Sequence, residues 1–527
     1  MTTLQVRSPA APRRRPPWYL LVPGIACALG VAVPLAYLVV QAVGADEDML
    51  RLLVWRPRNL GLLVNTLGLA AAVLAVVSVL AIPIAWLTAR TDLPGRRWCT
   101  LLAVMPLAVP GYLLAYTLLA VGGDVGTGAT VLGVRLPRLT GFWGALVALS
   151  LYNLPYMFLN LRVALNRTDP AQEEAARSLG HSPWSVFTRV TLPQLKPAYL
   201  AGALLVVLHV IGDFGVVSLM RFDTFSLALY NAYEMGDGIS ASWFGLALVV
   251  VAGILLALDW RFLRGLRLDP VGVTTPRVRR PVHLGRWALA AYGLILTVVL
   301  LSVAIPVATM AYWATNYRPT GVTGEWGRAL VDSLSGSLPA AALATLLAIP
   351  VAYLASRYRS RWSRALEQSA YIGYAIPSMA LALGLVLLSV GWPVYQSLTL
   401  LVGAYALHFL AEAIGPVRSA LYVATPRLEE AAQSLGYGRF KTLTRVTLPL
   451  LRPGLLVSLA LVFLSTMKEL ALTIILAPTD FQTLATRVWD YTNGAQYGAA
   501  APYALTLVGL GAGFVALLLV RGYETNG

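Results

Sequence analysis

Long apolar runs are the feature that most constrains the fold of this chain. The sequence contains twelve of them, separated from one another by charges, proline or glycine. They are centred on residues 18–43, 60–88, 98–121, 141–163, 195–220, 242–263, 287–313, 332–355, 366–390, 397–417, 453–477 and 500–520. A helix needs about 20 mostly apolar residues to cross a bilayer. The runs therefore predict an all-α integral membrane protein with about twelve transmembrane helices. The first run is too long for a cleaved signal peptide and is expected to remain as a helix.

The positions of the arginines predict which side of the membrane each loop faces. Short loops rich in Lys and Arg stay in the cytoplasm, so the three arginines at residues 13–15 place the N-terminus there. Alternation from that end puts the Arg-rich segments 90–97, 261–286 and 357–364 on the same side. The net charge of +16 then reflects topology and contact with anionic lipid, and we expect no nucleic-acid partner, because the bases are spread over short loops beside apolar spans.

Composition excludes several other classes of protein. With 58% hydrophobic and 12% charged residues, the chain is unlike a soluble globular domain. Its two cysteines, Cys27 and Cys99, have no CxxC spacing, so neither a disulfide framework nor a zinc site is indicated. The four histidines and two cysteines form no metal-spaced or catalytic constellation in the sequence. We therefore expect a protein that is not an enzyme and that binds no cofactor of its own.

A long internal repeat divides the chain into two halves. The segment LAIPIAWLTAR at 80–90 returns as LAIPVAYLASR at 347–357, and Pro110 returns as Pro377 at the same offset of 267 residues. After the third run the offset falls to 256, because the first half has a longer outer loop. Six spans thus repeat as six in the same orientation, which predicts two parallel repeats related by an axis along the membrane normal.

The repeat predicts four regions along the chain. These are a cytoplasmic tail (1–17), a first six-helix half (18–265), a cytoplasmic Arg-rich linker (266–286) and a second six-helix half (287–527). Prolines recur inside equivalent spans of the two halves, Pro83 with Pro350 and Pro110 with Pro377. They are expected to kink helices, either to permit rocking of the halves or only to shape their packing.

A charged octapeptide is repeated more faithfully than the spans around it. EEAARSLG occupies residues 173–180 and EEAAQSLG occupies 429–436. Of the 25 residues from 173 to 197, 15 are identical in the aligned copy. A polar loop that changes less than its apolar neighbours indicates a docking surface, and a recent duplication is the alternative.

Local signals around the octapeptide predict a helix, a turn and a second helix on the cytoplasmic side. In the first copy, which spans 169–193, Asp169 is the expected N-cap and Gly180 the left-handed terminator. Ser182 then begins a second short helix that is expected to run to Pro193. The second copy, at 425–449, keeps the same pattern.

These two segments resemble the cytoplasmic EAA loop of ABC-importer permeases of the binding-protein-dependent type. Two such loops in one twelve-span chain are similar to the fused permeases of the ferric-iron uptake group, and the resemblance covers nearly the whole chain. DFGVVSLMRFDTFSLALYNAY at 213–233 and MKELALTIILAPTDFQTLATRVWDYT at 467–492 look like the corresponding regions of iron(III) permeases. Permeases for thiamine and for phosphonates share much of the same pattern.

The resemblance implies the type I ABC-importer permease fold, a location in the inner membrane and two kinds of partner. Each EAA loop would sit in a groove on a separate ATPase subunit, two in all, and an extracytoplasmic binding protein would deliver the substrate. ATP–Mg would be bound by the partner ATPase, because none of the three lysines of this chain completes the phosphate-binding motif GxxxxGK[ST]. The implied contacts, with the glutamates offering carboxylates to basic groups of the partner, are Glu173, Glu174, Ala175, Ala176, Gly180, Glu429, Glu430, Ala431, Ala432 and Gly436.

Ionisable residues inside apolar spans are candidates for the transport pathway. Asp213 and Glu469 are separated by the repeat offset of 256, so both halves carry an acid at the same place. A hard cation such as Fe³⁺ prefers oxygen ligands, and these acids are candidates for transient contacts or a negative field. The alternative is that they pair with Arg221 or Lys468 and hold helices together. Weaker candidates stand four residues apart on expected helix faces, His209 before Asp213 and His408 before Glu412.

The function expected from these features is that of the membrane permease of an ATP-driven importer, with ferric iron as the expected cargo. Thiamine or an organophosphonate is the alternative cargo within the same class. An ion-coupled secondary transporter is the alternative of another class, and the intramembrane acids are compatible with it. That alternative does not account for the duplicated polar loop.

Overall fold

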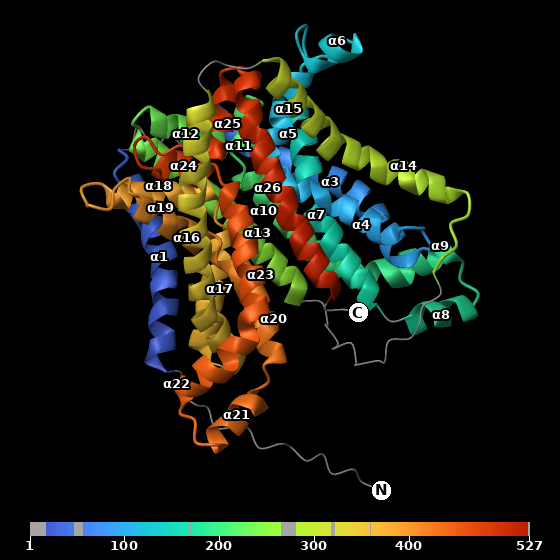
Figure 1. Ribbon diagram of the computed structural model, residues 1–527, viewed down its shortest axis with the longest axis vertical. Helices are drawn as coiled ribbons and strands as arrows, with labels where there is room; N and C mark the ends of the chain where they lie inside the picture. Colours follow the sequence, from blue (N-terminus) through green and yellow to red (C-terminus); the bar gives the residue numbers. More distant parts are fainter. Residues whose placement is uncertain are drawn as a thin grey trace. The chain divides into compact units, whose positions relative to one another are not determined.

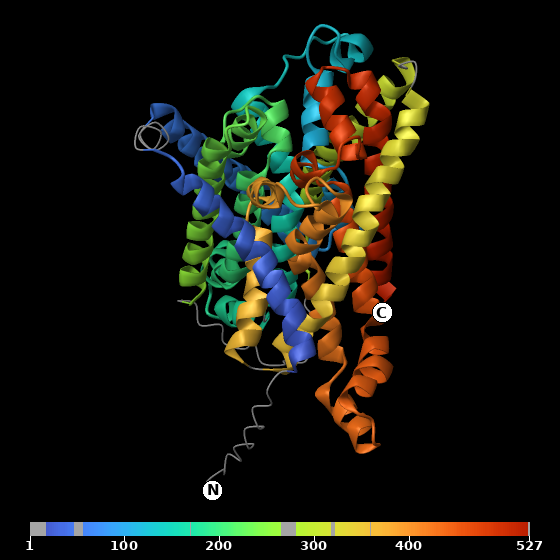
Figure 2. The ribbon, with the colours of Figure 1, turned by 90° about the vertical axis from the view of Figure 1, so that its left-hand side faces the viewer.

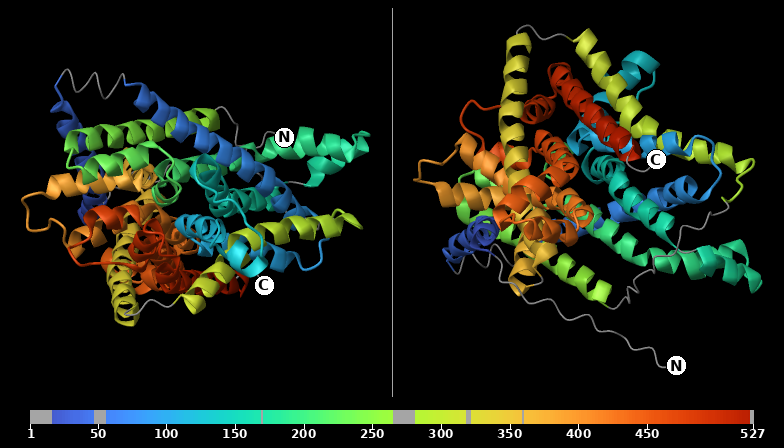
Figure 3. Two further views of the ribbon diagram at one scale, coloured as in Figure 1. Left: turned by 90° about the horizontal axis from the view of Figure 1, so that it is seen from above. Right: turned by 60° about the horizontal axis from the view of Figure 1, so that its bottom comes forward.

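The fold is all-helical in a computed structural model that describes residues 17–46, 56–168, 170–264, 281–317, 322–358 and 360–524 (Figure 1). Apart from an isolated bridge between Thr91 and Val282, the regular structure of these residues consists of helices. Figures 2 and 3 show the same coiled ribbons and short connections from other directions. Most of the predicted tail at 1–17 and most of the predicted linker at 266–286 lie outside the described residues.

Nine helical segments in the described residues are long and apolar enough to cross a membrane. They are Trp18–Val43, Pro57–Arg90, Gly141–Asn166, Trp184–Gly212, Gly238–Phe262, Trp287–Asn316, Glu325–Arg357, Phe440–Met467 and Tyr497–Val515. Three further spans pass the same test as bent pairs, which raises the number to as many as twelve. Each predicted apolar run thus corresponds to one helix or one bent pair.

The third span of each half is broken at a proline. In the first half α4 (Arg96–Val104) is followed by a short 3-10 turn and then by α5 (Gly111–Val121), and the break bends by 85°. In the second half α17 (Arg361–Ala375) and α18 (Ser378–Ser389) meet at 102°. Pro110 and Pro377 stand directly before α5 and α18, where a missing N–H costs nothing. A third bend, of 53°, separates α19 (Leu398–His408) from α20 (Leu410–Val423).

The other repeated prolines leave their helices continuous. Pro83 lies inside α3 (Pro57–Arg90) and Pro350 inside α16 (Val322–Arg357). The prediction of kinks is therefore confirmed for the pair at residues 110 and 377, where the chain breaks completely. Proline alone does not decide the outcome, because neighbouring backbone and packing can absorb the lost hydrogen bond.

The second short helix expected after Gly180 is not a separate element, and this prediction is wrong. Instead α9 (Pro183–Val186) passes through a π-helical turn (Phe187–Thr191) into α10 (Leu192–Gly212). The second copy behaves alike, with α22 (Arg439–Thr442), a π turn (Leu443–Thr447) and α23 (Leu448–Met467). Each π turn ends two residues before a proline. A proline ring clashes with the carbonyl four residues earlier, and a wider turn moves that carbonyl away without ending the helix.

Two short helices precede the last span in each half. The first half has α11 (Gly215–Leu219) and α12 (Phe225–Glu234) before α13 (Gly238–Arg264). The second half has α24 (Ala471–Leu476) and α25 (Leu484–Asn493) before α26 (Tyr497–Glu524). The remaining described α-helices are α1 (Trp18–Val43), α6 (Thr127–Leu132), α7 (Gly141–Arg167), α8 (Pro170–Ser178), α14 (Trp287–Val299), α15 (Ile305–Asn316) and α21 (Pro426–Ser434).

The chain packs as two compact units that do not coincide with the two sequence halves. The larger unit holds Leu35–Gly336, Ala375–Leu401 and Met467–Gly527, and the smaller holds Ser337–Tyr374, Val402–Thr466 and the chain up to Pro34. Helices from both halves therefore share the core of the larger unit. There Phe214 packs against Tyr230 and Trp489, with ring centroids 4.6 and 5.6 Å apart.

Candidate functional site

The two repeated polar loops, which we call the first polar loop (residues 170–193) and the second polar loop (425–449), begin with matching helices. These are α8 (Pro170–Ser178) and α21 (Pro426–Ser434). Gly180 and Gly436 follow them with φ of 85° and 87°, a left-handed conformation that glycine adopts without a steric penalty. The predicted helix and turn are therefore present in both copies. Asp169, the expected N-cap of the first helix, lies outside the described residues.

The first glutamate of the first polar loop points into the protein. Glu173 accepts a hydrogen bond through Oε1 from Nη2 of Arg90 at 2.8 Å and another from the Thr191 hydroxyl at 3.1 Å. Arg90 is the last residue of α3 and also donates to the Thr168 hydroxyl. Both members of the ion pair are largely shielded from solvent. The carboxylate thus anchors the loop to the second span of its own half.

The second polar loop has the same anchor with one more donor. Glu429 Oε1 accepts from Nε and Nη2 of Arg357 at 3.3 and 3.2 Å and from the Thr447 hydroxyl at 3.3 Å. Its Oε2 accepts from the Tyr353 hydroxyl at 2.9 Å. Arg357 also donates to the carbonyl oxygens of Leu421 and Ala424, which lie just before the loop.

The inward direction of Glu173 and Glu429 differs from the expectation that they offer carboxylates to a partner. A carboxylate removed from water needs a paired base and further donors, and the second span of each half supplies the base. A sequence signal for it exists, because Arg90 and Arg357 are related by the 267-residue offset and end the best repeated apolar segment. The next glutamates, Glu174 and Glu430, are exposed.

The outer faces of the two loops carry apolar side chains at matching positions. Leu179 and Leu435 are 80% and 82% exposed, and Trp184 and Phe440 are 73% and 71% exposed. The sequence interpretation missed these four residues. The signal was available, because each pair is separated by 256 residues and keeps a large apolar side chain within a polar segment. Of the predicted alanines, Ala175 and Ala431 are exposed, whereas Ala176 and Ala432 are buried beneath their helices.

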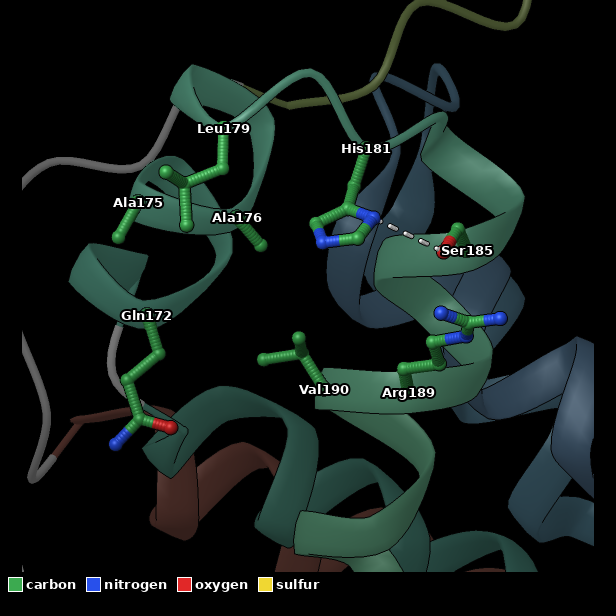
Figure 4. Close-up of a pocket in the computed structure, with 8 residues that line it drawn as sticks. All are labelled: Gln172, Ala175, Ala176, Leu179, His181, Ser185, Arg189 and Val190. Carbon is green, nitrogen blue, oxygen red and sulfur yellow. Dashed lines mark hydrogen bonds between the residues drawn. The ribbon is translucent and has the colours of Figure 1, made fainter.

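A hollow of about 370 Å³ separates α8 from the helix that follows it (Figure 4). Ala175 and Leu179 line one side, and His181, Ser185 and Arg189 line the other. The His181 ring nitrogen Nδ1 lies 3.5 Å from the Ser185 hydroxyl.

The second polar loop has different side chains at the two positions that correspond to His181 and Ser185. They are Tyr437 and Lys441, and the Lys441 ammonium lies 4.6 Å from the centroid of the Tyr437 ring. The two loops therefore share an anchor and an apolar outer edge but differ on the side that faces the hollow in the first loop.

The two intramembrane acids cap the short helices that follow the fifth span of each half. Asp213 Oδ1 accepts from the backbone N–H of Val216 at 2.8 Å, at the start of α11. Glu469 Oε1 accepts from the backbone N–H of Leu472 at 3.1 Å, at the start of α24. Both belong to the larger unit. The Lys468 ammonium donates to the carbonyl oxygen of Leu107 at 3.0 Å.

The histidines do not share a helix face with the acids that follow them. α10 ends at Gly212, before Asp213, and α19 ends at His408, before the bend that precedes Glu412. His209 bonds the carbonyl of Leu205 and stacks on Tyr156, and His408 bonds the carbonyl of Gly373. In the described residues no group of three or more His, Cys, Asp or Glu could hold a metal ion.

Equivalent positions in the fourth and fifth spans touch in both halves, with different chemistry. His209 stacks on Tyr156 with ring centroids 4.5 Å apart. The residues 256 positions later are Ser465 and Glu412, and the Ser465 hydroxyl donates to Oε2 of Glu412 at 2.7 Å. The contact between these two positions is therefore repeated in the fold, but it is aromatic stacking in the first half and a hydrogen bond to a carboxylate in the second.

Comparison with known proteins gives one family, matched twice. Residues 81–260 and 344–523 each match the family described as binding-protein-dependent transport system inner membrane component. The prediction of two equivalent permease halves in one chain is thereby confirmed.

Relatives cover the chain to different extents. The Fe(3+)-transport system permease protein FbpB 2 of Haemophilus influenzae is 32% identical over 94% of this chain and 96% of its own length. A probable ABC transporter permease, y4fN of Sinorhizobium fredii, is 24% identical over 83% of each chain. The sulfate transport system permease protein CysW of Escherichia coli is 28% identical over 46% of this chain and 88% of its own length.

Proposed function

Because the chain belongs to the family of inner membrane components of binding-protein-dependent transport systems, we propose that it is the permease of an ATP-driven importer of ferric iron. The observation that carries the iron assignment is the full-length similarity to the Fe(3+) permease of Haemophilus influenzae. The sulfate permease matches less than half of this chain, at lower identity. Two carboxylates at equivalent places in the spans also suit a cation better than an oxyanion.

The two polar loops are the proposed docking sites for two ATPase subunits in the cytoplasm. Leu179 with Trp184, and Leu435 with Phe440, offer exposed apolar side chains of the kind that anchor protein interfaces. Glu173 and Glu429 hold each loop to the second span of its half, so a push on the loop is transmitted to a transmembrane helix. Glu174 and Glu430 remain available to basic groups on the partner. In this scheme the N-terminus is cytoplasmic, and ATP–Mg is bound by the partner.

Cargo movement in this proposal follows alternating access. A binding protein delivers iron from the outer side, and closure of the ATPase pair opens the cavity outward for loading before it returns inward. Asp213 and Glu469 supply a negative field and transient oxygen contacts on the way. Tight binding is not needed, since conduction requires release. His209, His408 and Glu412 are the weaker pathway candidates, because none of them has an equivalent acid or histidine in the other half.

Uptake of radiolabelled ferric iron into proteoliposomes tests the proposal directly. The vesicles contain this chain, its ATPase and the iron-loaded binding protein. The Gly180→Arg/Gly436→Arg variant should abolish ATP-driven uptake, because both glycines have positive φ and an arginine there would disturb the docking turn. Asp213→Asn/Glu469→Gln should lower uptake. Helix content and elution volume establish that the variants are folded.

A matched control uses a second pair of acids with the repeat offset. Glu234 and Asp490 are 256 residues apart and exposed, so Glu234→Gln/Asp490→Asn should retain most of the uptake. Equal losses in the two acid variants would remove the assignment of Asp213 and Glu469 to the pathway. Uptake without ATP would favour an ion-coupled carrier. ATP-driven uptake of thiamine or an organophosphonate in place of iron would keep the importer and overturn its cargo.

A further inference from the structure

The loop between α5 and α7 forms a small projecting lobe, which we call the outer lobe (residues 122–140). It contains α6 (Thr127–Leu132), and Figures 1 and 2 show it beyond the end of α5. The equivalent loop of the second half, which we call the short loop (residues 390–397), is 11 residues shorter, as the change in repeat offset from 267 to 256 requires. The outer lobe is therefore a feature of one half only.

The outer lobe has a closely packed backbone at its base. The N–H of Gly123 donates to the carbonyl of Leu136 at 2.8 Å, and that of Val134 donates to the carbonyl of Gly128 at 3.0 Å. A Cβ on Gly122 would lie 2.8 Å from the carbonyl oxygen of Pro137, and one on Gly126 would lie 2.4 Å from that of Val121. Only glycine fits such approaches. The loop thus holds one shape, which is suited to a contact surface.

The exposed face of the outer lobe is apolar with a positive edge. Val125, Val131 and Val134 are all more than half exposed. Arg135 is exposed and lies 4.0 Å from the carboxylate of the exposed Asp124, an ion pair that is worth little in water. A loop that only connects two helices through solvent has no use for three exposed valines held on a fixed backbone, whereas a contact surface does.

The side chains of the outer lobe favour a protein over the bilayer as its partner. Residues that anchor a chain at the membrane interface are typically Trp and Tyr. The sequence from 122 to 140 contains neither, whereas the short loop exposes Trp392 and Tyr395. The short loop therefore has the composition of an interfacial anchor, and the outer lobe does not.

The position of the outer lobe indicates which partner it meets. α7 runs from the outer lobe at Gly141 to the first polar loop after Arg167, so the two lie at opposite ends of one membrane-spanning helix. If the polar loop faces the ATPase, as in the proposed function on which this inference rests, the outer lobe faces the extracytoplasmic binding protein. We propose that the outer lobe docks an apolar patch with acidic edges on that binding protein and fixes its orientation on the permease.

One-sided placement supports the orienting role. A single binding-protein chain has no two-fold symmetry, whereas the repeats of the permease offer two similar faces. A contact present in one half only removes the ambiguity between the two orientations. The apolar face supplies affinity, and Arg135 supplies attraction to carboxylates and specificity.

The test measures stimulation of ATP hydrolysis by the binding protein in proteoliposomes. The probe is the purified binding protein of the same organism that, when loaded with Fe³⁺, stimulates the wild-type complex. In the variant Val125→Asp/Val131→Asp/Val134→Asp, the concentration for half-maximal stimulation should rise about tenfold or more. Arg135→Glu should raise it as well, by a smaller factor. ATP hydrolysis without binding protein should be unchanged.

The short loop provides the matched control. Val390→Asp/Val394→Asp also places two acids at exposed valines on the same side of the spans, and half-maximal stimulation should remain within about twofold of wild type. An unchanged value for the outer-lobe variant, or an equal rise in both variants, overturns the orienting role. If no loaded binding protein stimulates the wild-type complex, the proposed function fails together with this inference.

Labelling of a Val131→Cys variant tests the contact without relying on activity. Both native cysteines, Cys27 and Cys99, are free and buried, so a membrane-impermeant maleimide should report on the introduced thiol. Labelling should be fast in proteoliposomes alone and slow at saturating binding protein. Protection in the absence of binding protein would show that lipid or the chain itself covers the outer lobe and would overturn the proposal, as would fast labelling at saturation.

Discussion

The first and second polar loops are anchored by the same ion pair but not by the same number of donors. Glu173 is held by Arg90 and Thr191, and Glu429 by Arg357 and Thr447. Tyr353 adds a hydrogen bond to the second carboxylate only, since the equivalent residue of the first half is Trp86. Both copies retain the arginine at the end of the second span and the threonine at the end of the π turn in the fifth span. These two residues therefore form the common anchor.

The first half has a different reinforcement close to its arginine. The N–H of Val282 donates to the carbonyl of Arg90 at 2.9 Å, and the N–H of Asp92 donates to the carbonyl of Val282 at 3.1 Å. The Asp92 carboxylate then accepts from the N–H of Leu284 and bonds the His283 ring. The chain that enters the second half is thus tied to the end of α3. The equivalent of Asp92 in the repeat is Arg359, so the second half cannot copy this contact.

Removal of either anchoring arginine should have the largest effect. Arg90→Ala and Arg357→Ala each leave a buried carboxylate without its base, at a cost of about 3 kcal/mol or more. Amide exchange in α8 or α21, respectively, should become about a hundredfold faster. The exposed neighbours give the control, because Glu174→Gln and Glu430→Gln should leave exchange nearly unchanged. Similar exchange in the arginine variants and wild type would contradict the anchoring role.

Tyr353→Phe should have an intermediate effect, confined to the second polar loop. It removes a hydrogen bond to a carboxylate, worth about 1.5 to 3 kcal/mol. Exchange in α21 should therefore become about tenfold faster or more, with no change in α8. Trp86→Phe is the matched variant in the first half and should leave exchange in α8 close to wild type. If the two substitutions loosened their loops equally, the difference between the anchors would not lie in this hydroxyl.

Acidification should have the smallest effect, confined to the first half. The backbone N–H of Leu284, followed by the His283 side chain, holds the pKa of Asp92 below its ordinary value. A carboxyl whose pKa is lowered on folding stabilises the fold above its unfolded pKa, about 4, and loses that contribution as the pH falls through its folded pKa. Exchange of residues 281–286, corrected for the intrinsic pH dependence, should accelerate as the pH falls below about 4. In Asp92→Asn this acceleration should be absent, and its persistence would assign the pH dependence to another group.

Much of the architecture was predictable because it depends on local or repeated patterns in the sequence. Apolar length predicted the spans, and the two offsets predicted the equivalent breaks at Pro110 and Pro377. The positive φ of Gly180 and Gly436 followed from the preference of helix ends for glycine. The continuation of α9 into α10 did not follow, because proline before a long apolar run is compatible both with a helix start and with a π turn inside a helix.

The candidate site was only partly predictable, because its key contacts join distant segments. The octapeptide identified the loops, but the direction of Glu173 depends on Arg90, which is 83 residues away in the sequence. The exposed Leu179 and Trp184 were visible as repeated apolar residues, yet their exposure depends on where α8 and α9 pack. Asp213 caps α11 only because α10 ends at Gly212, one residue earlier. Hydropathy locates the end of a helix only to within several residues, so this role could not be predicted from the sequence.

The sequence by itself determined that this protein is helical, lies in a membrane, consists of two similar halves and carries two equivalent polar loops. Those properties follow from hydropathy and internal repetition, which need no knowledge of contacts. Only the tertiary structure decided that Glu173 and Glu429 turn inward, while Leu179 and Leu435 face outward. The physical reason is that a buried carboxylate is tolerated only where a base and other donors meet it. Which residues meet is set by helix packing.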